Sequence, residues 1–281
     1  MNNADFINQL KDILTLDTLI ILSAIAVLSY WLAKTSFGKN ALIYAKIRRT
    51  SMPFYIPFIP LLIWFALISL AMTISRQLYP NAPEPTLAML DNIALGSSAI
   101  VAIIAMIALA RKFFARKLKG LGLAPKHFFK DFALAFLTLL AVWPLILTAF
   151  GLTVTIGQLI KGPEFTIEQH QELILIAKNA QLHVRIIIAV VTILIIPVFE
   201  EMLFRGYFQT LIRSYIKSPW PAIIITSIIF AVTHANLTHW AVIFTLSMAL
   251  GYSYEKSASL YRPIFIHAMF NATSVITTML Q

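Results

Sequence analysis

The stretch RIIIAVVTILIIPVFEEMLFRG, residues 185–206, is an apolar run that ends in two adjacent glutamates and an arginine. Other apolar runs of roughly 18 residues or more, the length that spans a hydrocarbon core, recur along the chain. The 281 residues are 59% hydrophobic and 12% charged, whereas an average soluble domain is about 25% charged. This composition predicts an all-α, polytopic membrane protein.

We expect about eight transmembrane helices and one membrane domain over residues 1–281. The spans are expected near residues 17–33, 53–75, 92–110, 132–156, 185–204, 220–236, 240–254 and 262–280. The fifth helix is expected to continue to Ile216, before a turn at Lys217. Within this domain, residues 183–281 are expected to form the catalytic core, and residues 1–182 to supply the N-terminal helices that complete the bundle.

The basic residues indicate an orientation. Of the 22 Lys and Arg residues, 17 fall in four alternate connecting segments, residues 34–52, 111–131, 205–219 and 255–262. The positive-inside rule places these segments in the cytoplasm and both termini outside, in what we expect to be a bacterial inner membrane. The net charge of +10 is then explained by orientation and by contact with anionic lipid headgroups, and it does not indicate a nucleic-acid partner.

Ionisable groups at membrane depth are the informative residues, because each costs several kcal/mol unless it is paired or lines a cavity. Glu201 and Arg205 are four residues apart, so they are predicted to form an ion pair on one helix face. Glu200 lies about 100° around the same helix and stays free to accept a proton. His267 and Asn271 are also four residues apart and share a face of the last helix. The chain has no cysteine, which excludes thiol chemistry.

Depth in the membrane supports a common site. Glu200 lies 17 residues before Lys217 and His234 lies 17 residues after it, so two antiparallel helices would hold them at nearly one level. His267 and Asn271 would meet this pair only in a cavity open toward the cytoplasm. A carboxylate and an imidazole that share a proton can activate water, and the other two side chains can donate N–H groups to an oxyanion.

Other readings of these residues are weighed against the catalytic one. A buried Glu–Arg pair often only locks two helices, and a single intramembrane histidine is more often a packing residue. A proton- or cation-coupled transporter and a non-catalytic scaffold or immunity protein are the alternative functions. Residues 157–184 are predicted to form a solvated external loop, and no role is assigned to four further histidines, His127, His170, His183 and His239.

Three ordered motifs resemble those of the CPBP family, also called Abi, which includes type II CAAX prenyl endopeptidases and bacteriocin-processing proteins. They are Glu-Glu-x-x-x-Arg at 200–205, Phe-x-x-x-His at 230–234 and His-x-x-x-Asn at 267–271. The resemblance implies an eight-helix intramembrane peptidase with a cavity open to the cytoplasm. It assigns water activation to Glu200 and His234, an oxyanion hole to His267 and Asn271, and support to Glu201, Arg205 and Phe230.

The resemblance leaves the cofactor and the substrate open. Glu200, His234 and His267 are also a possible zinc ligand set, and the family has carried a metalloprotease label. A metal-free mechanism is favoured because the amide of Asn271 suits an oxyanion donor better than a zinc ligand. The expected partner is a membrane-associated peptide or protein, whether a prenylated tail, a leader peptide or a membrane protein.

Overall fold

The computed structural model describes residues 15–125, 128–179, 181–234 and 236–280. Of the described residues, 79% are helical, and the only β-type pairing among them is an isolated bridge between Thr50 and Phe114. The predicted all-α class is therefore confirmed. The expected division into an N-terminal part and a catalytic core stays a prediction.

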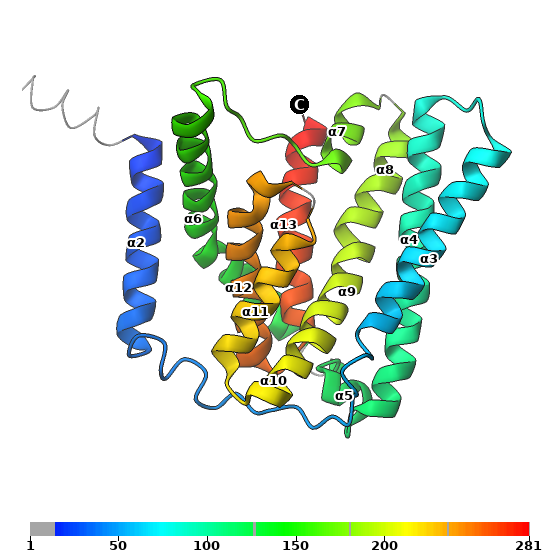
Figure 1. Ribbon diagram of the computed structural model, residues 1–281. Helices are drawn as coiled ribbons and strands as arrows, with labels where there is room; N and C mark the ends of the chain where they lie inside the picture. Colours follow the sequence, from blue (N-terminus) through cyan, green and yellow to red (C-terminus); the bar gives the residue numbers. More distant parts are fainter. Residues whose placement is uncertain (1–14, 126–127, 180, 235, 281) are drawn as a thin grey trace, which may run out of the picture.

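The helices form a bundle in which most axes run in one general direction (Figure 1). In chain order the helices are α2 (Leu16–Lys34), α3 (Phe58–Leu78), α4 (Glu84–Phe113), α5 (Lys117–Leu121), α6 (Phe128–Lys161), α7 (Gln171–Lys178), α8 (Leu182–Val190), η2 (Val191–Ile195), α9 (Ile196–Glu201), η3 (Met202–Gln209), α10 (Thr210–Ile216), α11 (Pro219–Val232), η4 (Leu237–His239), α12 (Trp240–Ser257) and α13 (Tyr261–Leu280).

The segments from α8 to α10 follow one another without a break, so one helix runs from Leu182 to Ile216. The predicted continuation of this helix to Ile216 is confirmed. It ends because Lys217 adopts a left-handed backbone conformation, with φ +63°. Two of its segments, η2 and η3, are π-helical, a feature often found at functional sites.

The protein is a multi-pass membrane protein. Six helices of the described chain are long and apolar enough to cross a bilayer: α2, α3, α4, α6, the continuous helix 182–216, and α13. Each of the eight expected spans lies on a helix, but α11 has only 14 residues and α12 is not among the six. The count of eight transmembrane helices therefore stays a prediction.

The outward faces of the bundle are apolar, as lipid contact requires. Leu62 and Phe65 on α3 and Leu137 on α6 are exposed. Inside, small residues of α4 let the helix 182–216 approach closely; a Cβ added at Gly96 would lie 2.9 Å from a methyl group of Val191. The largest core cluster collects around α9 and η3 and includes Phe199, Met202, Tyr207 and Phe230. The stretch that carries the glutamates is thus central to the fold.

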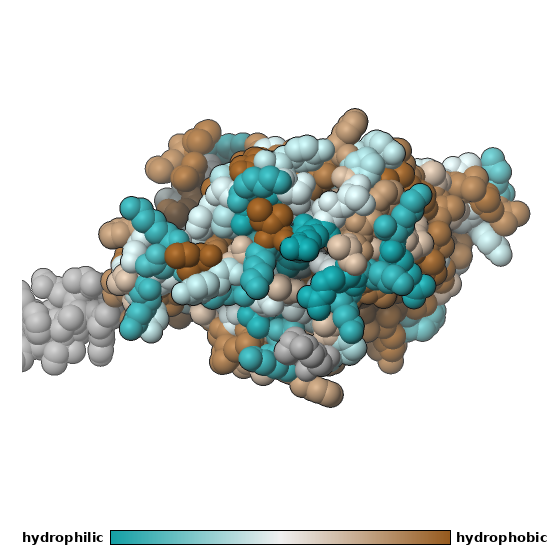
Figure 2. All heavy atoms as spheres, turned by 90° about the horizontal axis from the view of Figure 1, so that it is seen from below, coloured by the Kyte–Doolittle hydropathy of each residue, from teal (hydrophilic) through white to brown (hydrophobic). Residues whose placement is uncertain are grey.

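The two ends of the bundle differ in composition. One end holds the connection between α2 and α3, helix α5, and the turns that precede α11 and α13 (Figure 1). This end includes the basic segments, and hydrophilic side chains gather across it (Figure 2). A buried carboxylate, Glu255, lies 3.8 Å from both Arg48 and Arg213 and fastens the connecting segment to the bundle. The opposite end holds α7 and the C-terminal end of α13 (Figure 1).

The hairpin of α11 and α12 stops short of this opposite end. With a rise of about 1.5 Å per residue, the 14 residues of α11 cover only about two thirds of a hydrocarbon core of roughly 30 Å. The helix ends at Val232, and the Asn236 side chain then accepts from Thr238 N to start η4. The short hairpin leaves room between the longer helices, and the candidate site lies there.

The segment 157–184 is more helical than predicted. It was predicted to be a solvated loop, yet α6 continues to Lys161 and residues 171–178 form α7. Leu173 and Ile176 of α7 pack with Val184 and Ile188 of α8 and with Val275 of α13. The prediction was wrong because the three glutamates, the glycine and the proline of this segment indicated a loop, whereas the apolar face of α7 that indicates a helix is short.

Candidate active site

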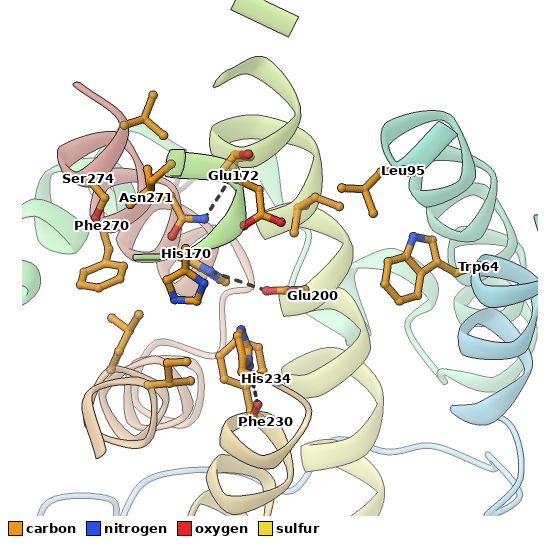
Figure 3. A pocket seen from close by; sticks show the side chains of 17 residues that line it. Trp64, Leu95, His170, Glu172, Glu200, Phe230, His234, Phe270, Asn271 and Ser274 are labelled. Atoms are coloured by element: carbon orange, nitrogen blue, oxygen red, sulfur yellow. Dashed lines mark hydrogen bonds and ion pairs between the residues drawn. The ribbon is translucent and has the colours of Figure 1, made fainter. Parts of the chain in front are cut away.

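A cavity of about 270 Å³ lies between α3, α4, α7, α13 and the end of the α11–α12 hairpin. Four predicted site residues line it: Glu200, His234, His267 and Asn271. Figure 3 shows Glu200 of the helix 182–216, His234 at the end of α11 and Asn271 of α13 around one space. The structure therefore brings together residues that are up to 71 positions apart in the sequence.

The expected ion pair between Glu201 and Arg205 is present behind the cavity wall. Arg205 Nη1 donates to Glu201 Oε1 at 2.7 Å, and both side chains are fully buried. Arg205 Nη2 also donates to Ser247 Oγ at 2.7 Å, and its guanidinium lies 4.5 Å from the centroid of the Phe230 ring. A buried charge is tolerated only when it is paired and hydrogen-bonded, so these partners hold Arg205 and Glu201 in a fixed arrangement.

His267 connects this pair to the cavity. Its Nδ1 lies 2.8 Å from Glu201 Oε1, and its Nε2 lies 3.6 Å from Glu200 Oε2. The imidazole thus sits between the two glutamates, while the Glu200 side chain keeps 20% of its surface exposed. His267 reaches this level because α13 packs against α9. The expected joint action of Glu200 and His234 stays a prediction.

His234 presents one ring nitrogen to the cavity. Its Nδ1 lies 2.8 Å from the carbonyl oxygen of Phe230, and since a carbonyl can only accept, Nδ1 is the donor. The ring also packs edge-on against Phe230, at 4.9 Å between centroids. Nε2 is therefore the nitrogen left for chemistry. Phe230, expected to be a supporting residue, contacts His234 on one side and the Arg205 guanidinium on the other.

Asn271 is oriented by an unusual feature of the backbone. Its Nδ2 donates to the carbonyl oxygen of Thr192 at 3.0 Å. In the π-helical register, Ile196 N–H bonds to Val191 O, so Thr192 O loses its usual α-helical donor. The next donor in that register would be residue 197, which is a proline without an N–H. Pro197 thus leaves Thr192 O free to fix Asn271, whose second N–H remains available.

The hydrogen bonds fix the direction of the contact between His267 and Glu201. The Glu201 carboxylate, which accepts from Arg205, can only accept, so His267 Nδ1 donates to it. His267 Nε2 is the ring nitrogen that faces Glu200 Oε2, at 3.6 Å. It can donate toward the cavity only when the ring carries its second proton.

A zinc site was the alternative use of Glu200, His234 and His267. Both imidazoles are oriented through Nδ1, as metal-binding histidines commonly are. However, over the residues that the structure describes, no three His, Asp or Glu side chains lie close enough to hold one ion. Two of the three candidate ligands, His267 Nε2 and Glu200 Oε2, lie 3.6 Å apart. The metal-free mechanism stays a prediction, and the steps below use protein groups alone.

Two further residues of the cavity wall, His170 and Glu172, were not predicted. His170 stacks on His239, with 4.2 Å between ring centroids, and lies 6.4 Å from the ring of His234. Desolvation of its ring, followed by the proximity of His239 and His234, lowers the pKa of His170 from 6.5 to about 4. The only sign of this segment in the sequence was the spacing of Leu173 and Ile176, two apolar residues three positions apart in the helix that follows His170.

The side on which the cavity lies also differs from expectation. The basic segments and the cavity opening were both expected at the cytoplasmic face. In the structure, His170, Glu172 and Leu173 line the cavity, and they belong to the connection at the end opposite the basic segments (Figure 1). The short α11–α12 hairpin leaves its space at that end. Basic segments and cavity therefore lie toward opposite ends of the bundle.

One comparison with known proteins found a match. Residues 182–273 match the family model described as type II CAAX prenyl endopeptidase Rce1-like. The matched range contains every predicted site residue and covers the elements from α8 into α13, whereas α2 to α7 lie outside it. No curated protein and no solved structure matches the chain.

Proposed function

We propose that this chain hydrolyses a peptide bond inside the bilayer, with water activated by Glu200 and His234. Through residues 182–273 the chain belongs to the Rce1-like family of type II CAAX prenyl endopeptidases. Endopeptidase activity is the activity of the family. The observation that carries the mechanism is the shared cavity, in which a carboxylate, two imidazoles and an amide converge.

In the proposed first step, a water molecule lies between the Glu200 carboxylate and Nε2 of His234. As its oxygen attacks the carbonyl carbon of the substrate, Glu200 accepts a proton from it. Negative charge develops on the carbonyl oxygen, where His267 Nε2–H and the free N–H of Asn271 donate to it. Glu200 becomes neutral as the oxyanion forms, so the net charge of the buried cluster does not change.

In the second step the protonated Glu200 returns the proton to the leaving nitrogen. The C–N bond breaks to give a new carboxylic acid and a new amine, and the acid proton then passes to the amine, directly or through water, to leave a carboxylate and an ammonium group. Glu201, Arg205 and Phe230 do not touch the substrate in this scheme. They hold His267 and His234 at the positions that the first step needs, which is the usual role of side chains behind a catalytic group.

Hydrolysis by this route does not depend on a metal ion. Purified protein should cleave peptides from a mixed-sequence library at the same rate before and after incubation with a strong chelator, with fragments identified by mass spectrometry. Loss of cleavage on chelation, with recovery on adding zinc, would replace this mechanism by a metal-dependent one. The absence of cleavage under all conditions would contradict the proposed function itself.

We propose the orientation from the positive-inside rule, with the basic end in the cytoplasm. Because the chain has no cysteine, single-cysteine variants can report it directly. Lys39 lies in the basic connection between α2 and α3, and Glu164 lies in the connection between α6 and α7; both residues are exposed. An impermeant thiol reagent added to intact cells should label Glu164→Cys only. Labelling of Lys39→Cys alone would reverse the orientation and place the cavity toward the cytoplasm.

A further inference from the structure

The cavity wall contains a carboxylate that the proposed reaction does not use. Glu172 lies in the first turn of α7, is half-buried and lines the cavity. Figure 3 shows it above Glu200, near Asn271, in the view drawn. The packing of Leu173 and Ile176 against α8 and α13 fixes α7 in place. The carboxylate is therefore held at the substrate-facing wall.

No positively charged residue in the cavity wall pairs with Glu172. The residues that line the cavity include two carboxylates, Glu172 and Glu200, and neither lysine nor arginine. His267 faces Glu200 and not Glu172, and Arg205 behind the wall is paired with Glu201. Among the described residues, the carboxylate of Glu172 has no hydrogen bond or ion pair within the protein. His170, which lies two residues before Glu172 and also lines the cavity, is neutral at pH 7 because its pKa is lowered to about 4.

We infer that Glu172 is a specificity residue that binds a positively charged side chain, Lys or Arg, of the substrate next to the cleaved bond. The inference rests on the proposed function and adds the class of substrate to it. An unpaired carboxylate in a partly desolvated wall attracts a cation and repels an anion. The cavity, at about 270 Å³, is slightly smaller than most ligand pockets, which start at about 300 Å³, so a substrate side chain beside the cleaved bond would lie close to its wall.

The test uses three peptides that differ at one residue beside the cleaved bond, which is Lys, Gln or Glu. The parent peptide is the one that wild-type protein cuts best from a fluorescence-quenched library. Wild-type protein should prefer Lys to Glu by about tenfold or more in kcat/KM, the factor for about 1.4 kcal/mol of differential interaction. Glu172→Gln should remove the preference and Glu172→Lys should reverse it.

Glu164→Gln is the matched control, because it makes the same change in the same connection, outside the cavity wall. It should keep the wild-type order of peptides. If wild-type protein cleaves and Glu172→Lys keeps the order Lys, Gln, Glu, the inference is overturned while the proposed function stands. Equal losses on all three peptides in both Glu172 variants would make Glu172 a structural residue and also overturn it. If wild-type protein cuts no peptide, the proposed function itself fails.

Discussion

Glu200→Gln is expected to abolish most of the peptidase activity and to leave the folded protein intact. Glutamine keeps the shape of the side chain and can still hydrogen-bond to His267, but it cannot accept a proton from water. General base catalysis contributes about 10²–10⁴-fold in rate, so kcat should fall by a factor in this range. The measurement is peptide cleavage by purified protein, together with its thermal unfolding curve.

A control separates loss of the base from loss of negative charge. Glu84→Gln makes the same substitution at an exposed residue in the first turn of α4, away from the cavity. Its cleavage rate should match that of the wild type. A Glu200→Gln variant that folds normally and cleaves within a few-fold of the wild-type rate would show that another group activates the water.

Arg205→Met is expected to cause the largest loss of stability among single changes at the site. It leaves Glu201 buried with only His267 as a partner, and breaking one side of a buried ion pair typically costs about 3–5 kcal/mol. The free energy of unfolding should fall by this order, and activity should fall with it because His267 loses its fixed position. Thermal unfolding in detergent or in lipid nanodiscs would measure the change.

The structure offers a matched comparison in Arg76. Its Nη2 lies 2.6 Å from Asp91 Oδ2, a distance like that of the buried pair, but its side chain is 47% exposed. Arg76→Met should therefore cost at most about 1 kcal/mol, as exposed ion pairs do. If both variants unfolded at the same temperature as each other, burial of the Arg205 pair would not be what stabilises this part of the fold.

The parts of this account that depend on local spacing could be predicted from the sequence. Hydropathy located the apolar helices, because a bilayer requires long apolar runs. The four-residue spacing of Glu201 and Arg205 predicted their ion pair, because such residues meet on one helix face. The structure also brings Glu200, His234, His267 and Asn271 to one cavity, as their cost in a membrane led us to expect.

The parts that depend on packing between distant segments could not be predicted. The contact of His267 with both glutamates follows from the placement of α13 against α9, which no local pattern specifies. The hydrogen bond from Asn271 to Thr192 depends on a π-helical register, and such registers are rare and carry no simple sequence signal. The role of α7 was missed because its 8 residues follow a polar segment that resembles a loop.

The central claim is that Glu200 activates the attacking water while His267 and Asn271 receive the oxyanion. The most direct test is an experimental structure with a phosphinic peptide based on the best-cleaved sequence, since its tetrahedral phosphorus mimics the transition state. One phosphinate oxygen should lie within hydrogen-bond distance of the Glu200 carboxyl group, and the other within reach of His267 Nε2 and Asn271 Nδ2. A phosphinate that binds a metal ion, or that lies away from Glu200, would contradict the claim.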